Sequence, residues 1–350
     1  MKFELEKLVR DNIKRLKPYS SARHEFTGEA SVFLDANENP YGSTLAEDFN
    51  RYPDPLQWQL KFEIAKIKGV PAENIFIGNG SDEVIDLAYR IFCNPGKDNV
   101  IVCPPTYGMY EVSGNINDVE IRKVNLQEGF QLDTEGIMNA VDENTKILFI
   151  CSPNNPTGNN MNRPDVEFLL NNFPGLILID EAYINYSRQK TFIQELTEYP
   201  NIIVMQTLSK AWGLAALRLG LGFASLDIID LFNKVKPPYN INKASQELAL
   251  EALAETAQVN EWIKETVAQK EYLAKELATF SFVKKVFPSD ANFLLVRVDD
   301  ANKLYDHLSA SGVIVRNRSK EYMCENSLRI TIGTPDEDKK LLNLFKSYGK

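Results

Sequence analysis

Histidine and cysteine are both scarce in this chain of 350 residues. It has 2 histidines, His24 and His307, and 4 cysteines, which lie far apart with no C-x-x-C pair among them. A zinc site, a disulfide framework and a Ser-His-Asp triad all depend on these two residue types. The sequence therefore disfavours hydrolase and metal chemistry, and it predicts no metal site.

A long apolar run and an excess of positive charge are also missing. No run approaches the roughly 20 apolar residues of a membrane span. The N-terminus mixes charged with apolar residues, whereas a signal peptide has an uninterrupted apolar core. The net charge of −9 disfavours a nucleic-acid partner. We therefore expect a cytoplasmic protein with neither a membrane nor a nucleic-acid partner.

Short apolar runs alternate with amphipathic stretches through the central two thirds of the chain. The runs that indicate strands are 74–78, 99–103, 119–124, 146–151, 175–180 and 201–206. Helical patterns lie between them, among them 81–92, 163–172 and 192–198. This order favours right-handed crossovers and an α/β fold, in which a mostly parallel sheet has helices on both faces.

The pattern changes after Pro237-Pro238. A long helical pattern covers 242–279, with a break expected near 258–260. Beyond it we expect a small α+β unit, with strands at 282–287, 292–298, 312–315 and 327–332 and helices at 300–310 and 336–348. The first 30 or so residues hold a helix but no core, so we expect them to pack on this unit. The predicted domains are a large one, 36–278, and a small one made of 1–35 together with 279–350.

Polar residues follow three successive predicted strands. The strand at 146–151 runs into SPNNPTG (152–158), the next into DEAY (180–183), and the third into TLSK (207–210). Ligands of an open parallel sheet bind beyond the carboxyl ends of its strands. If these strands are neighbours, Asn155, Asp180, Tyr183 and Lys210 converge on one spot.

Asp180 directly follows a buried run, where an unpaired carboxylate is costly. Its partner could be Lys210 or a bound heterocycle with a protonated ring nitrogen. A desolvated lysine is a nucleophilic amine that forms a Schiff base with an aldehyde. Pyridoxal 5′-phosphate (PLP) requires this pair, a lysine for its aldehyde and a carboxylate for its pyridinium nitrogen. Asn155 and Tyr183 would then contact the phenolic oxygen of the ring.

Candidate ligands for a phosphate are present as well. The segment GNGSD (78–82) closes a predicted strand and opens a helix, whose free N–H groups suit an anion. Ser209 and Arg218 flank Lys210 with a hydroxyl and a fixed charge. Tyr107 offers a ring that can stack on a pyridine. Each feature alone is common in structural roles, and their joint occurrence at strand ends favours a PLP site.

These motifs resemble those of the fold-type I PLP-dependent aminotransferases over essentially the whole chain. SPNNPTG, DEAY and the segment from Ser209 to Arg218 are typical of that fold type. The resemblance is narrowed to the histidinol-phosphate aminotransferase family by KPYSSAR (17–23), DANENP (35–40), YPDP (52–55), TYGMY (106–110) and LRITIGT (328–334). It implies PLP as the cofactor and reversible amino transfer between L-histidinol phosphate and 2-oxoglutarate in histidine biosynthesis.

The resemblance also implies a role for each candidate residue. Lys210, Asp180 and Tyr183 would be catalytic, with Lys210 bound to the cofactor aldehyde and Asp180 paired with the ring nitrogen. The other cofactor ligands would be Gly80, Ser81, Asp82, Tyr107, Asn155, Thr207, Ser209 and Arg218. Tyr52 would reach the phosphate from the neighbouring subunit, which implies a homodimer with shared active sites. The substrate would be bound by Tyr19, Asn37, Arg316 and Arg329.

Several alternatives stay open at this level. Arg318 stands two residues after Arg316, so either arginine could be the second anion ligand. An aromatic or broad-specificity aminotransferase, or an enzyme similar to threonine-phosphate decarboxylase, would share the cofactor residues and differ only in the substrate pocket. A non-catalytic PLP-binding regulator is disfavoured because the N-terminal stretch is too short for a DNA-binding segment.

Overall fold

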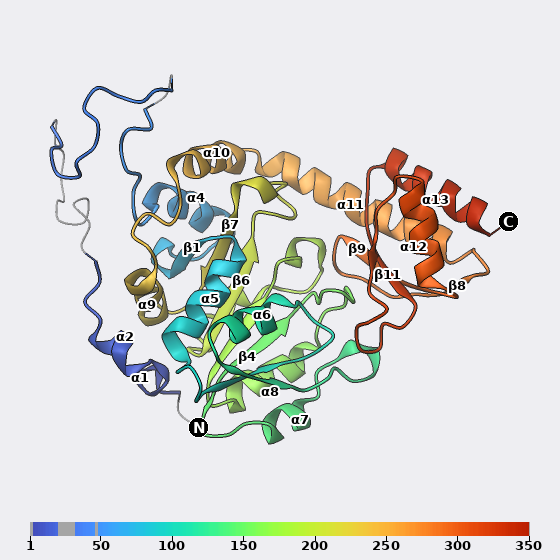
Figure 1. Ribbon diagram of the computed structural model, residues 1–350, viewed down its shortest axis with the longest axis horizontal. Helices are drawn as coiled ribbons and strands as arrows, with labels where there is room; N and C mark the ends of the chain where they lie inside the picture. Colours follow the sequence, from blue (N-terminus) through green and yellow to red (C-terminus); the bar gives the residue numbers. More distant parts are fainter. Residues whose placement is uncertain (1–2, 20–31, 46–47, 350) are drawn as a thin grey trace.

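A seven-stranded sheet forms the centre of the larger part of the molecule (Figure 1). The computed structural model describes residues 3–19, 32–45 and 48–349. The strand order is β1-β7-β6-β5-β4-β2-β3. The strands are β1 (Ile75–Asn79), β2 (Asn99–Val102), β3 (Glu120–Lys123), β4 (Thr145–Cys151), β5 (Leu176–Asp180), β6 (Ile202–Thr207) and β7 (Leu219–Phe223).

The sheet is mostly parallel, as the sequence predicts. Neighbours from β3 through β6 pair in parallel, and only β7 runs antiparallel to its neighbours β6 and β1. The sequence analysis missed β7, because two glycines interrupt its apolar run LGLGF. Gly220 passes so close to the backbone of Gly80 and Ser81 that a Cβ atom there would overlap them. The glycines lower the strand propensity of β7, but they let its backbone lie close to the start of α5.

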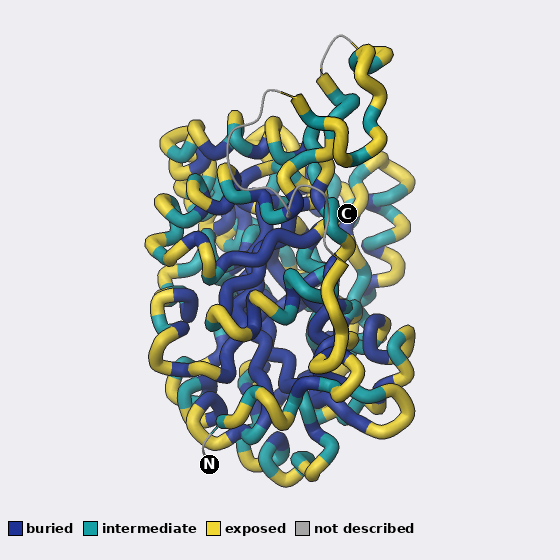
Figure 2. The backbone as a smooth tube through the Cα atoms, turned by 90° about the vertical axis from the view of Figure 1, so that its left-hand side faces the viewer, coloured by how far each residue is buried: buried dark blue, intermediate teal, exposed yellow. Residues whose placement is uncertain are grey.

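Alternate residues of the central strands enter two separate cores, one on each face of the sheet. On β4, Leu148 and Ile150 pack with α4 (Trp58–Lys68), α8 (Arg163–Asn172) and α10 (Lys243–Leu253). Ile147 and Phe149 pack with α5 (Ser81–Phe92), α6 (Met109–Ile116) and α9 (Leu226–Val235). Figure 2 shows the sheet as a buried centre beneath more exposed helices. Strands buried on both faces explain why these runs lack an apolar–polar alternation.

Most of the predicted helices are confirmed, and two details differ. The helices expected at 81–92 and 163–172 are α5 and α8. The helix expected at 192–198 is a single 3-10 turn, Phe192–Glu195, whose first N–H is held by the buried carboxylate of Glu181. The long pattern at 242–279 forms α10 and α11 (Thr256–Leu277), which divide at Ala254-Glu255 and not at 258–260.

The N-terminal helices pack on the large sheet domain. Helices α1 (Leu5–Leu8) and α2 (Asp11–Arg15) place Val9 and Ile13 in the core that also holds α5 and α9. The Arg10 N–H donates to the carbonyl of Ile91 at 3.0 Å. The expectation that this segment packs on the C-terminal unit is therefore wrong for the described residues. Its apolar positions four residues apart match the helical surface beside the sheet. Residues 20–31 of the predicted small domain lie outside the described part.

The C-terminal unit holds a second, antiparallel sheet in the order β10-β11-β9-β8. Its strands are β8 (Val283–Val286), β9 (Phe293–Val298), β10 (Arg316–Asn317) and β11 (Ser327–Thr331), with helices α12 (Ala301–Ala310) and α13 (Pro335–Tyr348). The strand expected at 312–315 lies instead at Arg316–Asn317, after a turn at Gly312, where φ is +74°. Helix α11 contributes Leu273 to this core and Val259 to the large one, so a boundary at 278 stays a prediction.

Candidate active site

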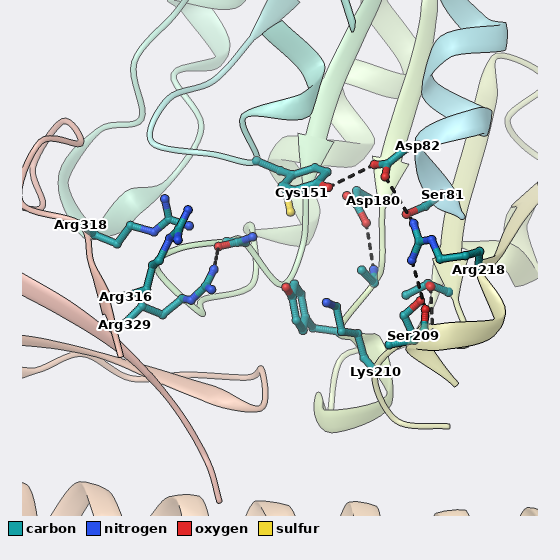
Figure 3. A pocket seen from close by; sticks show the side chains of 16 residues that line it. Ser81, Asp82, Cys151, Asp180, Ser209, Lys210, Arg218, Arg316, Arg318 and Arg329 are labelled. Carbon is teal, nitrogen blue, oxygen red and sulfur yellow. Dashed lines mark hydrogen bonds and ion pairs between the residues drawn. The ribbon is translucent and has the colours of Figure 1, made fainter. Parts of the chain in front are cut away.

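A cavity of about 370 Å³ lies where β4, β5 and β6 end, facing the second sheet. Figure 3 shows Lys210, Asp180 and Arg218 entering it from the large sheet domain and three arginines from the other side. Its lining consists of Ser81, Asp82, Tyr107, Cys151, Asn155, Asp180, Ala182, Tyr183, Thr207, Ser209, Lys210, Ala215, Arg218, Arg316, Arg318 and Arg329. The strand ends of an α/β sheet are where ligands bind in such folds.

Most of the predicted site residues line this cavity, and four do not. Gly80 lies just behind the cavity, and its N–H donates to the carbonyl of Arg218 at 2.6 Å. Tyr19 is 73% exposed and Tyr52 is 51% exposed, and Asn37 is exposed as well. Tyr52 is expected to act in the site of a neighbouring subunit, and that role stays a prediction. The substrate roles of Tyr19 and Asn37 stay predictions.

Asp180 is the buried carboxylate of the cavity. Its Oδ2 accepts a hydrogen bond from the hydroxyl of Tyr110 at 2.7 Å, and its Oδ1 accepts one from the N–H of Ala182 at 3.0 Å. Burial raises the pKa of Asp180 to about 6, against the opposing effects of these two donors and of the positive charge of Lys210. Asp180 is thus held in place, and a cation in the cavity would stabilise its ionised form.

Tyr110 is a functional neighbour that the sequence analysis did not single out, although it stands in the TYGMY motif. Its ring is fully buried and stacks on Phe149 of β4 with centroids 4.8 Å apart. The signal was its spacing, three residues after Tyr107 at the start of a helix, which places both rings on one side. Tyr110 fixes the orientation of the Asp180 carboxylate.

Lys210 follows β6 after a short turn. The hydroxyl of Thr207 accepts the N–H of Ser209 at 3.0 Å, which directs the chain toward the cavity. The Nζ atom of Lys210 lies 5.7 Å from the ring centroid of Tyr183. Desolvation lowers the pKa of Lys210, and the charge of Arg329 adds to this effect while Asp180 opposes it. The amine is therefore easier to deprotonate than a lysine in water, as a Schiff-base lysine requires.

An anion cradle lies at the start of α5. The backbone of Arg218 is left-handed, with φ 57°, and its guanidinium NH2 lies 3.6 Å from Asp82 Oδ2. A Cβ atom on Gly80, whose φ is +75°, would meet that guanidinium group. Tyr107 donates its hydroxyl to the other oxygen of Asp82 at 3.1 Å. The helix N-terminus, the Ser81 hydroxyl and Arg218 form a cradle of the kind that binds phosphate.

Three arginines line the opposite side of the cavity (Figure 3). Arg316 of β10 pairs in register with Arg329 of β11, and Arg318 follows one residue beyond β10. Arg329 NH1 donates to Asn155 Oδ1 at 2.5 Å, which joins the two domains across the cavity. The Nε atoms of Arg318 and Arg329 are buried without a hydrogen-bond partner among the described residues. Arg316 and Arg318 both line the cavity, so the structure allows either of them, or both, to be the second anion ligand.

The cavity residues fit PLP in charge and in donor type. Among the described residues Asp180 forms no ion pair, so beyond the hydrogen bonds from Tyr110 and Ala182 its negative charge can still pair with a ring nitrogen. Lys210 supplies the amine, and the start of α5 with Arg218 supplies the phosphate cradle. The described residues contain no cluster of histidine, cysteine, aspartate and glutamate that could hold a metal ion. None of the described helices is both long and apolar enough to cross a bilayer.

Comparisons with known proteins agree with this geometry. Residues 30–345 match the family model of aminotransferase class I and II. The histidinol-phosphate aminotransferase of Cytophaga hutchinsonii is 53% identical over 348 residues, which is 99% of this chain and 100% of that protein. The enzyme of the same name from Parabacteroides distasonis is 53% identical over 344 residues, covering 98% and 99% of the two chains.

Solved structures share the fold at lower identity. The histidinol-phosphate aminotransferase from Clostridium acetobutylicum has a TM-score of 0.79 at 24% identity and covers 86% of this chain and 91% of that one. The structure of the Sinorhizobium meliloti enzyme of the same name, in complex with pyridoxal-5′-phosphate, has a TM-score of 0.78 at 24% identity, with 89% and 90% covered. These matches confirm the predicted fold-type I architecture. The chain belongs to the class I and II aminotransferases.

Proposed function

We propose that this chain is a PLP-dependent transferase that moves an amino group between L-histidinol phosphate and 2-oxoglutarate in histidine biosynthesis. The observation that carries the proposal is one cavity with the Lys210–Asp180 pair on one side and three arginines on the other. The first side suits PLP, and the second suits a substrate with an anionic end. The relatives with about 50% identity over nearly the whole chain support this choice of substrate.

Lys210 performs the proton transfers in this proposal. Bound PLP supplies an acceptor for the electron pair that stays on the substrate carbon when its proton leaves. The Nζ atom of Lys210 would take that proton as a general base and, as a general acid, would deliver it to the C4′ carbon of the cofactor, so that the amino group stays with the cofactor. Desolvation, with the charge of Arg329, lowers the pKa of Lys210, so its amine gives up its own proton more readily than a lysine in water.

Asp180 keeps the cofactor's ring nitrogen protonated. The pKa of Asp180 is raised to about 6 by burial, yet the group is still mostly ionised at pH 7. Tyr110 and Ala182 hold its two oxygens, so only a small reorganisation is needed when the ring cation arrives. Asn155 and Tyr183 also line the cavity, and in this proposal they would contact the phenolic oxygen of the cofactor ring.

The arginines must accept two different anions in turn. Histidinol phosphate carries a phosphate, and 2-oxoglutarate carries a second carboxylate at its far end. A planar guanidinium group binds either anion with two parallel hydrogen bonds. The hydrogen bond from Arg329 to Asn155 leaves its other nitrogens available for the substrate. We assign Arg329 and Arg316 to the anionic end of the substrate.

We further propose a cytoplasmic homodimer with shared active sites. The segment 32–45 extends away from the large domain (Figure 1). It carries apolar side chains that lie almost entirely in solvent, with Tyr41 at 96% and Leu34 at 89% exposed. Exposed apolar groups of this size are typical of a surface that a partner covers. Tyr52 follows this segment in the sequence, donates its N–H to Glu38 of the segment at 2.7 Å and is half exposed, which supports its role in the neighbouring subunit.

Half-reactions followed by rapid-mixing absorbance test the proposed substrate. L-histidinol phosphate should convert bound PLP to its amine form within one turnover, and 2-oxoglutarate should restore the aldehyde form. Phenylalanine and threonine phosphate should react at least about tenfold more slowly, because phenylalanine lacks the phosphate, and threonine phosphate lacks the imidazole ring and carries an extra carboxylate. Faster conversion by phenylalanine, or carbon dioxide release from threonine phosphate, would show that the substrate is wrongly assigned.

A further inference from the structure

Lys236 ends α9 with its side chain buried beneath two loops. It is only 7% exposed, and its Nζ atom donates to the backbone carbonyls of Pro55 at 2.7 Å, Pro238 at 2.9 Å and Pro237 at 3.2 Å. A lysine ammonium group has three N–H donors and no acceptor. The three carbonyls therefore use all of its donors, and the charge has no other partner within hydrogen-bond distance among the described residues.

The two loops that Lys236 joins present a pair of aromatic rings. Tyr52 precedes Pro55 in the YPDP motif, and Tyr239 follows Pro238. The two rings stack with their centroids 4.5 Å apart and an angle of 16° between their planes. The N–H of Tyr52 also donates to Glu38 Oε1 at 2.7 Å. Tyr52 is thus held by its backbone and by its ring, while half of its surface stays exposed.

The same loops are tied to the cofactor side of the molecule. Gln57, which is 1% exposed, donates its Nε2 to the Pro55 carbonyl at 2.7 Å. Asn240 donates its Nδ2 to the carbonyl of Ile77 at 2.9 Å and to Glu83 Oε2 at 3.0 Å. Glu83 lies in the first turn of α5, beside the phosphate cradle. Both loops are therefore fixed to rigid elements, with Lys236 as the charged group between them.

We infer that Lys236 is a positioning residue, which holds the Tyr52–Tyr239 pair so that the Tyr52 hydroxyl can reach the cofactor phosphate in the partner subunit. The inference rests on the proposed function, in which Tyr52 serves the neighbouring site. A loop fixed before binding loses less conformational entropy when it forms its contact. Without the ammonium group, the carbonyls of Pro237 and Pro238 lose this donor, the Pro55 carbonyl keeps only that of Gln57, and the two loops are held together less tightly. Lys236 acts through Tyr52 and does not itself touch the cofactor.

PLP titration of the apoenzyme gives a readout that fold stability alone does not move. Tyr52→Phe and Lys236→Met should each weaken PLP binding about tenfold, the scale of one hydrogen bond to a charged group. The double variant should bind PLP no more weakly than Tyr52→Phe, because Lys236 has no effect once the Tyr52 hydroxyl is gone. The thermal stability of the apoenzyme should fall for Lys236→Met in both backgrounds.

Two further variants sharpen the result. Lys236→Arg keeps the charge and several donors, so it should fold even if the methionine variant does not, and it should bind PLP more tightly than Lys236→Met. It should show the same non-additivity with Tyr52→Phe. Lys61→Met is the matched control, because Lys61 is 2% exposed in the adjacent α4 and contacts the Trp58 ring at 5.2 Å instead of the loop carbonyls. PLP affinity should change less than twofold in this control.

The outcomes separate the inference from the function it rests on. If Tyr52→Phe binds PLP as tightly as the unaltered protein, the shared-site role of Tyr52 fails and the inference falls with it. If Tyr52→Phe weakens binding while the Lys236 variants do not, or if their effects are additive, only the inference is overturned. Equal weakening by Lys61→Met would also overturn it, since the effect would then come from the loss of any buried lysine.

Discussion

The two sides of the active-site cavity are built in different ways. The cofactor side is anchored by residues at the ends of buried strands: Asp180, Asn155, Thr207 and Tyr183 are all at most 7% exposed, whereas Lys210 and Arg218 are exposed. The substrate side consists of long, half-buried or exposed arginines on a second, smaller sheet. The difference suggests that the first side is preorganised for one cofactor and the second is adaptable enough for two anions.

The largest test of this comparison is Lys210→Ala on the cofactor side. Turnover should fall by roughly 10³-fold or more, because the variant loses the base that moves the substrate proton. Binding of histidinol phosphate should change much less, since the arginines remain. Single-turnover absorbance measures the chemical step, and equilibrium titration measures binding. Near-normal turnover in this variant would rule out Lys210 as the catalytic base.

Asp180→Asn tests the same side with a smaller change in shape. The amide cannot stabilise a ring cation, so turnover should fall roughly 10²- to 10³-fold, the scale expected when one partner of a buried charge pair is removed. Tyr110→Phe is the graded companion, because it removes one hydrogen bond from the carboxylate and keeps the charge. It should lower turnover only a few-fold. The spectrum of bound PLP should shift more in Asp180→Asn than in Tyr110→Phe.

Most residues of the cofactor side could be predicted from the sequence, and the reason is physical. Asn155, Asp180 and Lys210 stand in contiguous motifs directly after apolar runs, and the carboxyl ends of neighbouring parallel strands meet at one edge of a sheet. Tyr110 was missed because its role depends on the distance between α6 and β5, which no local pattern encodes. The strand β7 was missed because its glycines lower strand propensity and are needed only for contact with α5.

Less of the substrate side could be predicted, because it depends on the register between strands and on segments that are distant in the sequence. The strand expected at 312–315 lies four residues later, as β10, and only this register sets Arg316 opposite Arg329. Arg318 appeared in the sequence as a competitor of Arg316, whereas the structure places both on the cavity. The N-terminal helices were assigned to the wrong core, because an amphipathic helix indicates that it needs an apolar surface without indicating which one.

Arginine substitutions probe the adaptable side. Arg329→Gln should raise the KM for both histidinol phosphate and glutamate roughly 10- to 100-fold, as expected for a lost charge-assisted hydrogen bond. Arg318→Gln should affect histidinol phosphate more than glutamate, because a phosphate dianion has more oxygens and charge to distribute among three arginines. Initial rates of both half-reactions give the comparison. Equal effects of Arg318→Gln on the two substrates would show that all three arginines act as one site.

The smallest effect concerns the apoenzyme, in which Asp180 has no cofactor cation. Burial raises the pKa of Asp180 from 3.8 to about 6. Between these values the folded state binds a proton that the unfolded state has released, so stability falls as the pH rises from about 4 to 6. Asn cannot titrate, so Asp180→Asn should gain stability relative to the unaltered apoenzyme by up to about 3 kcal/mol over this window.

Denaturant unfolding at pH 4 and pH 7 measures the difference, and saturating PLP should abolish it, because a ring cation stabilises the carboxylate. A difference that persists in the PLP-bound proteins would mean that Asp180 does not pair with the ring nitrogen, and the preorganised side of the comparison would lose its central contact.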